Sequence, residues 1–263
     1  MTTDAAGNFA PGHMLRFYAG AVIVFLMAPI VVGIIVAFSS GSRLEFPIPG
    51  VSLRWFEDAM NKPQFIDGLI VSTIIATGNA VLATIAGTGA AIALNHYVFP
   101  GRALIRAAVM LPIVIPGILI GLGLLFTLSA YGMRPGLLAA TIGHAVLGVP
   151  YVVAMVTAAL ANYDRSLERA SMNLGVGPVP TFFKITLPLI KSGVIAGAIT
   201  AFLVSFDNFS LSLFITRGDT LPLRLMQELR GYVDPSVAAI STVLVVGSLI
   251  LLMILLPVIA RER

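Results

Sequence analysis

The chain has 263 residues, of which 58% are hydrophobic and 11% are charged, and its mean hydropathy is +0.99. Soluble domains carry about 25% charged residues, so this composition excludes most soluble enzymes, which would expose large apolar patches here. Cysteine is absent, which excludes disulfides, thiolate metal sites and a cysteine nucleophile. The formal charge of +4 gives no reason to expect nucleic acid as a partner, since in a membrane protein the position of a charge matters more than the total. No metal site is expected.

Six hydrophobic segments follow one another, and each exceeds the roughly 20 residues that cross a bilayer as a helix. Each must be helical, because lipid offers the backbone no hydrogen-bond partner. The segments are residues 17–38, 65–96, 104–128, 136–161, 189–216 and 237–260. The sequence therefore predicts an all-α membrane protein with six transmembrane helices.

An even number of crossings places both termini on one side of the membrane. Cytoplasmic termini put nine basic residues inside and seven outside, which favours this orientation. The first segment is too long for a signal peptide and lacks a clear cleavage site, so we expect a retained span. We divide the chain into residues 1–64, with the first crossing and an outer loop, a five-helix transmembrane domain at 65–260, and a cytoplasmic tail at 261–263.

Two outer loops carry helix signals. Ser52 precedes a short helical pattern within residues 51–60 and is a suitable cap, and Asp234 is suitable before the last span. Residues 221–233 carry apolar side chains at helical spacing and predict an amphipathic helix. The apolar side chains are Leu221, Leu225, Met226 and Leu229.

Small residues and prolines mark the spans. Gly117 with Gly121, and Gly193 with Gly197, form G-x-x-x-G pairs that allow close helix approach. Pro112, Pro116 and Pro150 are expected to bend their spans, because proline removes a backbone donor.

The cytoplasmic loop at residues 162–188 is the most patterned connection. Ser166 is a suitable cap for a short helix, Glu168 in its first turn favours the helix dipole, and Gly175 is suited to end it. A second short helix is expected at residues 181–185. Its apolar anchors are Phe182, Phe183 and Ile185. On pattern alone, a loop that folds back on its own helices is slightly favoured over a docking surface for another protein.

The run Arg169-Ala170-Ser171, then Gly175, then Ile185-Thr186-Leu187-Pro188 resembles the EAA loop of permease subunits in binding-protein-dependent ABC importers. That pattern is Glu-Ala-Ala, three residues, Gly, nine residues and Ile-x-Leu-Pro. Arg169 stands at the glutamate position, with Glu168 one residue earlier, and Ser171 replaces the second alanine.

This resemblance implies a type I ABC importer permease fold, whose coupling helices sit in a groove of a cytoplasmic ATPase. The coupling residues it implies are Glu168, Arg169, Ala170, Ser171, Gly175, Phe182, Phe183, Ile185, Leu187 and Pro188. The implied partners are a second homologous permease, two ATPase subunits and a periplasmic or extracellular solute-binding protein. The implied location is the bacterial inner membrane.

No G-x-x-x-x-G-K-[ST] phosphate-binding loop occurs in the chain. ATP hydrolysis is therefore expected in a separate ATPase subunit, which would bind ATP and Mg²⁺. We expect this chain to bind no cofactor and to be a transporter subunit rather than an enzyme.

Asp207 is the only acidic residue deep inside a hydrophobic segment. A carboxylate near the middle of the bilayer costs about 2.5–3.5 kcal/mol, so it should face a cavity, a partner helix or a cation. The functional interpretation is a residue of the transport path that attracts a cationic solute. The alternative is a hydrogen bond between helices without solute contact.

The stretch 205–214, followed by Leu221-Pro222-Leu223, resembles the second permease of spermidine/putrescine-type importers. This resemblance implies a polyamine-like solute, for which aromatic rings would add cation–π contacts. The candidate path residues are Tyr151, Ser205, Phe206, Asp207 and Asn208. Related importers carry opines or aminophosphonates, and these solutes remain alternatives.

His144 has two open interpretations, a proton-relay group or, as we favour, a hydrogen bond to a neighbouring helix. A secondary transporter driven by an ion gradient is a second functional hypothesis, although such folds usually show internal repeats. An intramembrane serine hydrolase is a third, since His144 could pair with a membrane serine.

Overall fold

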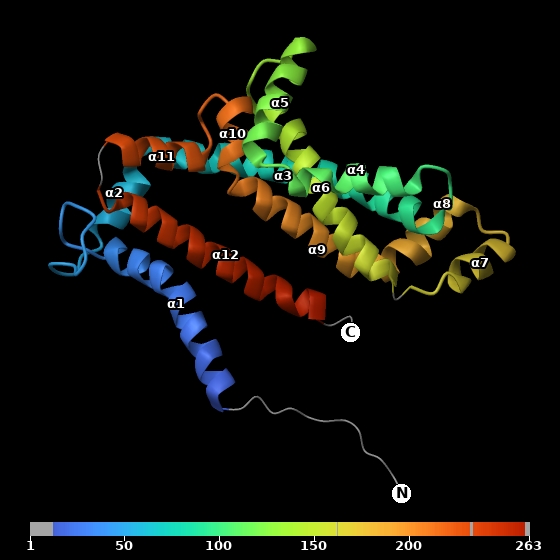
Figure 1. The fold of residues 1–263 in the computed structure, drawn as a ribbon, viewed down its shortest axis with the longest axis horizontal. Helices are drawn as coiled ribbons and strands as arrows, with labels where there is room; N and C mark the ends of the chain where they lie inside the picture. Colours follow the sequence, from blue (N-terminus) through green and yellow to red (C-terminus); the bar gives the residue numbers. More distant parts are fainter. Residues whose placement is uncertain (1–12, 162, 232–233, 261–263) are drawn as a thin grey trace, which may run out of the picture. The chain divides into compact units, whose positions relative to one another are not determined.

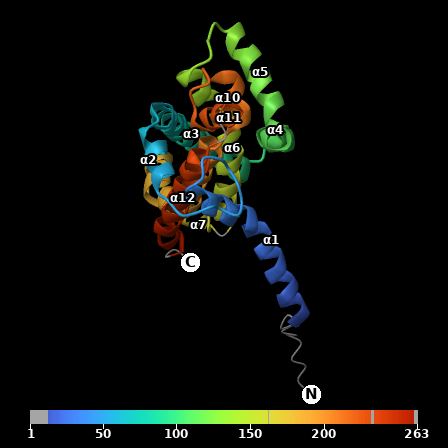
Figure 2. The same ribbon diagram turned by 90° about the vertical axis from the view of Figure 1, so that its left-hand side faces the viewer.

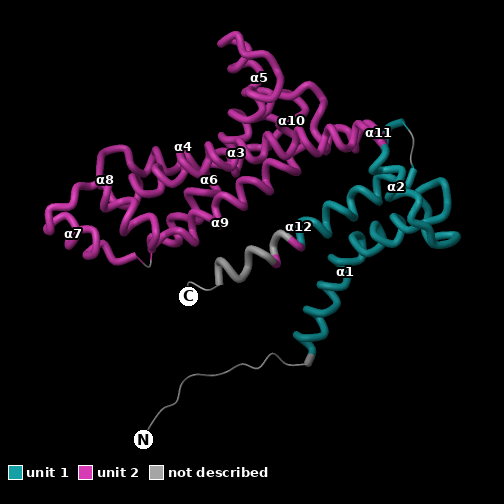
Figure 3. The backbone as a smooth tube through the Cα atoms, turned by 180° about the vertical axis from the view of Figure 1, so that it is seen from behind, with its two compact units in different colours: residues 1–61, 229–249 teal, residues 62–228, 250–263 magenta. Residues whose placement is uncertain are grey.

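The computed structural model describes residues 13–161, 163–231 and 234–260. These residues are almost entirely helical, and the only extended pairing among them is an isolated bridge between Ser39 and Val51. The chain forms two compact units, coloured separately in Figure 3: residues 1–61 with 229–249, and residues 62–228 with 250–263. The all-α fold predicted from composition is confirmed.

The first unit contains helices α1 (His13–Ala37) and α2 (Arg54–Asn61) and the first part of α12 (Ser236–Ala260). The Ser52 hydroxyl accepts the backbone N–H of Arg54 at 3.2 Å, which confirms Ser52 as the cap. The Asp234 carboxylate accepts the N–H of Ser236 at 2.9 Å, as predicted for the last helix. The indole of Trp55 donates to the carbonyl of Gly41 at 3.1 Å and fixes the intervening loop to α2.

Three long helices, α3 (Pro63–His96), α6 (Leu137–Ala161) and α9 (Leu187–Phe206), pack side by side in the second unit (Figure 1). Small residues bring their backbones close together. A Cβ on Gly197 would lie 3.0 Å from Cα of Val152, and one on Gly193 would lie 2.8 Å from the carbonyl of Met155. The Gly193 and Gly197 pair therefore faces α6, as its spacing permits.

The predicted span at 104–128 is not one straight helix. It is formed by α4 (Arg102–Val114) and α5 (Gly117–Ala130), which meet at an angle of 110° (Figures 1 and 2). Pro116 disfavours helical geometry at the residue before it, and Ile115 is extended, with φ −76° and ψ 134°. The bend expected at Pro116 is thus a complete interruption of the helix.

The predicted span at 189–216 is interrupted as well. Helix α9 ends at Phe206, and α10 (Phe209–Ile215) begins after the non-helical pair Asp207 and Asn208. The side chain of Asn208 accepts the backbone N–H of Leu211 at 2.9 Å. Because this amide oxygen caps a new helix, the chain turns here instead of continuing α9.

Four helices in the described part of the chain are long and apolar enough to cross a membrane, and the bent pair α4–α5 could supply a fifth crossing. The four are Met14–Ala37, Pro63–His96, Leu137–Ala161 and Pro178–Phe206. A shorter apolar helix covers Ser236–Ile250 within α12. The chain is therefore a multi-pass helical protein, while its six crossings remain a prediction.

Two short elements depart from the predicted boundaries. The helix expected at 181–185 is part of a continuous run in which α8 (Pro178–Thr181) and a π-helix (Phe182–Thr186) lead into α9. The amphipathic helix is α11 (Leu221–Gly231), and residues 232–233 of the predicted range lie outside the described residues. Its buried side chains are Leu221 and Leu223, whereas Met226 and Leu229 are exposed.

Candidate coupling loop and transport path

Helix α7 (Ser166–Asn173) carries the motif of the cytoplasmic loop. The side chain that bonds to the first turn of α7 is that of Asp164, and not the predicted Ser166. The Asp164 carboxylate accepts hydrogen bonds from the Ser166 N–H at 2.8 Å and from the Ser166 hydroxyl at 2.6 Å. Ser166 is the first helical residue, so its prediction as the cap was wrong by one position: the cap position is Arg165, whose side chain makes no capping hydrogen bond. The two hydrogen bonds from Ser166 lower the pKa of Asp164, so this carboxylate is charged at neutral pH.

Gly175 ends helix α7, as predicted. Its φ is +81°, its N–H donates to the carbonyl of Met172 at 3.0 Å, and the Val176 N–H donates to the carbonyl of Ser171 at 3.2 Å. This pair of bonds is the Schellman arrangement, which needs a left-handed residue. A Cβ on Gly175 would meet no atom within 4 Å, so a larger residue is disfavoured by its dihedral angles rather than by crowding.

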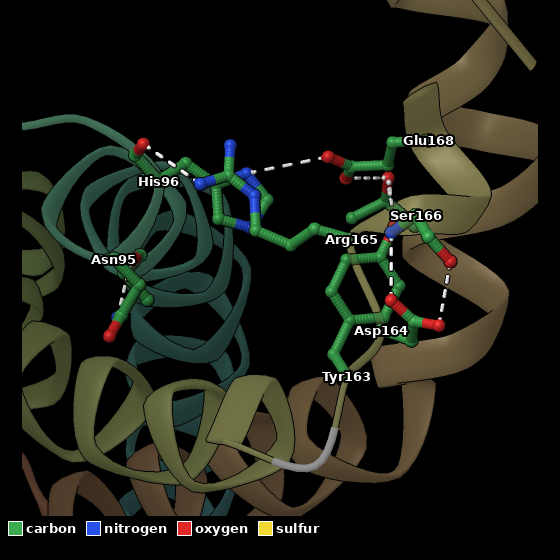
Figure 4. A network of polar contacts seen from close by, with 9 residues as sticks. Asn95, His96, Tyr163, Asp164, Arg165, Ser166 and Glu168 are labelled. Atoms are coloured by element: carbon green, nitrogen blue, oxygen red, sulfur yellow. Dashed lines mark hydrogen bonds and ion pairs between the residues drawn. The ribbon is translucent and has the colours of Figure 1, made fainter. Parts of the chain in front are cut away.

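The side chain of Glu168 points toward the helices of its own chain and is only 12% exposed. Its Oε1 accepts the hydroxyl of Thr186 at 2.5 Å, and its Oε2 lies 3.8 Å from Nδ1 of His96 (Figure 4). The neighbouring Arg169 is exposed. The two charged residues at the start of the motif therefore have different surroundings, and Glu168 links α7 to both α3 and the π-helix.

A second set of contacts holds the loop against the end of α3. Arg165 donates to the backbone carbonyl of His96 at 3.1 Å, which satisfies one of the free carbonyls at the C-terminus of that helix. The Tyr163 ring stacks on the His96 ring with centroids 6.2 Å apart. Figure 4 shows His96 at the end of its helix, facing Arg165 and Glu168. Sequence reasoning missed His96, Arg165 and Thr186, because no local pattern connects them.

The remaining predicted coupling residues divide by exposure. Ser171 is buried and its hydroxyl lies 2.9 Å from that of Thr181, which joins α7 to α8. Those partly buried are Phe182, Ile185 and Leu187; those exposed are Ala170, Gly175, Phe183 and Pro188. Large apolar side chains are exposed beside them. These residues, here named the apolar coupling surface, are Leu167, Met172, Leu174, Val179 and Phe183.

Asp207 lies at the C-terminal end of α9, in the interruption before α10, and its side chain is exposed in this chain. Its carboxylate makes no hydrogen bond or ion pair with any residue that the structure describes. Phe206 beside it stacks on Phe202, with ring centroids 5.7 Å apart. Asn208 is held as the cap of α10. Among these neighbours, the Asp207 carboxylate is the polar group left open to a solute.

His144 on α6 lies between the two halves of the interrupted span. Its Nδ1 is 2.7 Å from the hydroxyl of Ser205, and its Nε2 is 3.4 Å from that of Ser212. The hydrogen bond to neighbouring helices favoured for His144 is confirmed. A serine–histidine pair thus exists, but Ser205 is 6% and Ser212 1% exposed, which leaves no access for a hydrolytic substrate.

Tyr151 lies at a different level of the bundle from Asp207. Its neighbour Val152 packs beside Gly197 on α9, whereas Asp207 follows the end of that helix ten residues later. At 1.5 Å per residue the separation along the axis is about 15 Å. The structure therefore does not bring Tyr151 and Asp207 together around one compact ligand.

The two interrupted helices meet near Asp207. A Cβ on Gly117, the first residue of α5, would lie 3.1 Å from Cβ of Ser210, in the first turn of α10. The second glycine of the pair, Gly121, packs in the same way against Phe214. Non-helical backbone in a membrane is tolerated only where it is covered by protein or lines a cavity. The two breaks at 115–116 and 207–208 therefore mark the most suitable place for a path.

Known proteins with similar sequences are transport permeases. Residues 83–262 match the family described as binding-protein-dependent transport system inner membrane component. The putrescine transport system permease protein PotI of Escherichia coli K12 is 31% identical over 84% of this chain and 81% of its own. The spermidine/putrescine transport system permease protein PotC of the same organism is 29% identical over 96% of both.

Other relatives are more distant. The sulfate transport system permease protein CysT of Salmonella typhimurium LT2 is 26% identical over 80% of this chain and 82% of its own. Among solved structures, a bacterial ABC transporter involved in the import of the acidic polysaccharide alginate matches with a TM-score of 0.65 at 14% identity, covering 94% of each chain. This structural match supports the fold expected from the EAA-like loop.

Proposed function

Because the chain belongs to the family of binding-protein-dependent transport system inner membrane components, we propose that it forms half of the transmembrane path of an ATP-driven importer for a small organic cation. Membership makes the chain a permease subunit of an ABC importer and a multi-pass inner-membrane protein. It also favours the importer over the secondary transporter and the hydrolase. The six crossings, the cytoplasmic termini and the solute are parts of the proposal.

The partners proposed are a second homologous permease, a pair of ATPase subunits that bind ATP and Mg²⁺, and a solute-binding protein outside the membrane. The apolar coupling surface supports the ATPase contact, since exposed apolar patches of this kind mark protein interfaces. Leu174 in this surface is 84% exposed, and Val179 and Phe183 are more than half exposed. Arg169, which is exposed beside it, supplies a charge that an ATPase groove could bind.

The proposed solute is polyamine-like. The observation that carries this proposal is the carboxylate of Asp207 at the interruption of α9 and α10, which bonds to no residue that the structure describes. An ammonium group would replace the water that this carboxylate loses at membrane depth, and the ring of Phe206 offers a cation–π contact. The relatives PotI and PotC are named as permeases for putrescine and for spermidine and putrescine, which agrees with a cationic solute.

An anionic solute is the second candidate, because the sulfate permease CysT is also a relative. The position of Asp207 favours the cation, since a carboxylate in the path would repel sulfate. An opine or an aminophosphonate carries both signs of charge, so its ammonium group could bind Asp207 while its acidic groups would be repelled.

Reconstitution of the purified complex would test the proposal. The tagged chain would be isolated in mild detergent, its co-purifying subunits identified by mass spectrometry, and the complex placed in liposomes with ATP inside and the binding protein outside. We expect ATP-dependent uptake of labelled putrescine and none of labelled sulfate. Uptake of sulfate alone would refute the cationic solute, and uptake without any ATPase subunit would refute the energy source.

A further inference from the structure

His144 is a buried polar side chain of the second unit, at 2% exposure. It projects from the first third of α6, the helix that packs against both α9 and α10. The glycine before it, Gly143, lies against α10: a Cβ there would meet the side chain of Ile215 at 2.5 Å. The ring of His144 is therefore held where α10 leaves the line of α9.

The two ring nitrogens contact opposite sides of the interruption. Nδ1 is 2.7 Å from the hydroxyl of Ser205, in the last turn of α9, and Nε2 is 3.4 Å from that of Ser212, in α10. Between these two serines in the sequence lie Asp207 and Asn208, which are the only non-helical residues of the segment 205–212. A single imidazole thus bridges the break that carries the exposed carboxylate.

The chemistry of the three groups matches. A neutral imidazole has one donor and one acceptor nitrogen, and each serine hydroxyl can take either role. Both contacts can therefore form at once without a charge on the ring. No acidic side chain among the described residues bonds to His144, so a proton relay from the ring to Asp207 has no support.

We propose that His144 is a positioning residue, which fixes the angle between α9 and α10 through Ser205 and Ser212 and thereby places Asp207 in the transport path. The inference rests on the proposed function for the role of Asp207 in the path. That His144 fixes the angle between α9 and α10 does not depend on the proposed function. Buried hydrogen bonds specify one arrangement because the unbonded alternative leaves polar groups without partners.

The absence of cysteine in the chain makes the geometry measurable with spin labels. Leu189 near the start of α9 and Leu213 on α10 are both about half exposed, and paired cysteines there would report the distance across the break in the assembled complex. We expect a narrow distance distribution that broadens in His144→Phe and in the double variant Ser205→Ala with Ser212→Ala. His144→Gln, which supplies a donor and an acceptor, should keep it narrow.

Uptake kinetics supply the second readout. The solute concentration for half-maximal uptake should rise about tenfold in His144→Phe, equivalent to ~1.4 kcal/mol, while the maximal rate changes less than about twofold. The double variant Ser205→Ala with Ser212→Ala should show the same rise in the half-maximal concentration as His144→Phe. Combining all three substitutions should raise it no further, because the three groups act together. His144→Gln should restore most of the affinity.

A narrow distribution in His144→Phe and in the serine double variant would overturn the proposal and leave His144 a packing residue. Broad distributions with unchanged affinity would overturn the link to Asp207. If His144→Phe fails to assemble, the serine variants, which remove only hydroxyl groups, decide the question. The label distances do not depend on the solute, so a complex that takes up no putrescine would refute the proposed function and still test this inference.

Discussion

The carboxylate of Glu168 accepts a hydrogen bond of 2.5 Å from the hydroxyl of Thr186 and so joins helix α7 to the π-helix that leads into α9. Thr186 is 2% exposed, and the same carboxylate is near His96 at the end of α3. A movement of α7 would therefore reach two long helices directly. Glu168 thus ties α7 to the other helices of its own chain, while its neighbour Arg169 is exposed.

Replacing Thr186 by Val should loosen this joint, because it leaves a partly buried carboxylate with one hydrogen bond fewer. The loss should destabilise the loop by about 1–3 kcal/mol and lower uptake per ATP hydrolysed. The ratio of solute transported to phosphate released in proteoliposomes checks this. Arg169→Ala is the matched control for the exposed side of α7, and it should weaken ATPase binding instead. Equal effects of Thr186→Val and Arg169→Ala on both readouts would contradict the separate roles proposed for Glu168 and Arg169.

Gly175→Val should uncouple ATP hydrolysis from transport. A β-branched residue is strained at the φ of +81° by roughly 1–3 kcal/mol, so the end of α7 would rearrange and change the coupling surface. The control is Gly177→Val, because Gly177 has an ordinary φ of −65° and a Cβ there makes only a normal contact. Wild-type coupling in Gly175→Val, measured in the same proteoliposomes, would show that the turn is not required.

The sequence allowed some of these features to be predicted and not others. The end of α7 at Gly175 follows from a local rule about left-handed glycine, and the close approach at Gly193 and Gly197 follows from their spacing. The break at Asp207 and Asn208 was missed, because hydropathy favours one long helix there. The capping preference of Asn208 was the only local signal.

Contacts between distant residues were the other omission. His96 and Thr186 meet Glu168 only because α3, α7 and the π-helix end at the same place, and no pattern in one sequence contains that information. The same is true of the serines that bond His144. The EAA-like motif could be recognised from the sequence because it is local, whereas the contacts around Glu168 depend on tertiary structure.

Acidification should loosen α7 through Asp164. Its pKa is lowered in the folded chain by the hydrogen bonds from Ser166, so its stabilising contribution is fully present above the ordinary carboxyl range. That contribution is lost as the pH falls through the lowered value. The protection of the first-turn amides of α7 against hydrogen exchange, expressed relative to the intrinsic exchange rate at each pH, should therefore fall in acid and stay constant near neutral pH. Asp164→Ala should show low protection at every pH, and a wild-type protection that does not change with pH would contradict the assignment.

Asp207→Asn should weaken uptake of a cationic solute and leave assembly intact. The amide keeps the size of the side chain but removes the charge, and hydrogen bonds to charged groups contribute about 1.5–3 kcal/mol, so the apparent affinity for putrescine should fall by roughly ten- to a hundredfold. Because the carboxylate bonds to no described residue, the stability of the complex should not change.

Two further variants separate charge from position. Asp207→Glu keeps the charge and should retain most of the uptake. Asp58→Asn removes an exposed carboxylate from helix α2 and should have little effect on affinity. Affinity for putrescine measured in the reconstituted complex decides the matter. Unchanged affinity in Asp207→Asn, together with a less stable complex, would mean that Asp207 packs against a partner subunit and that the cation is recognised elsewhere in the path.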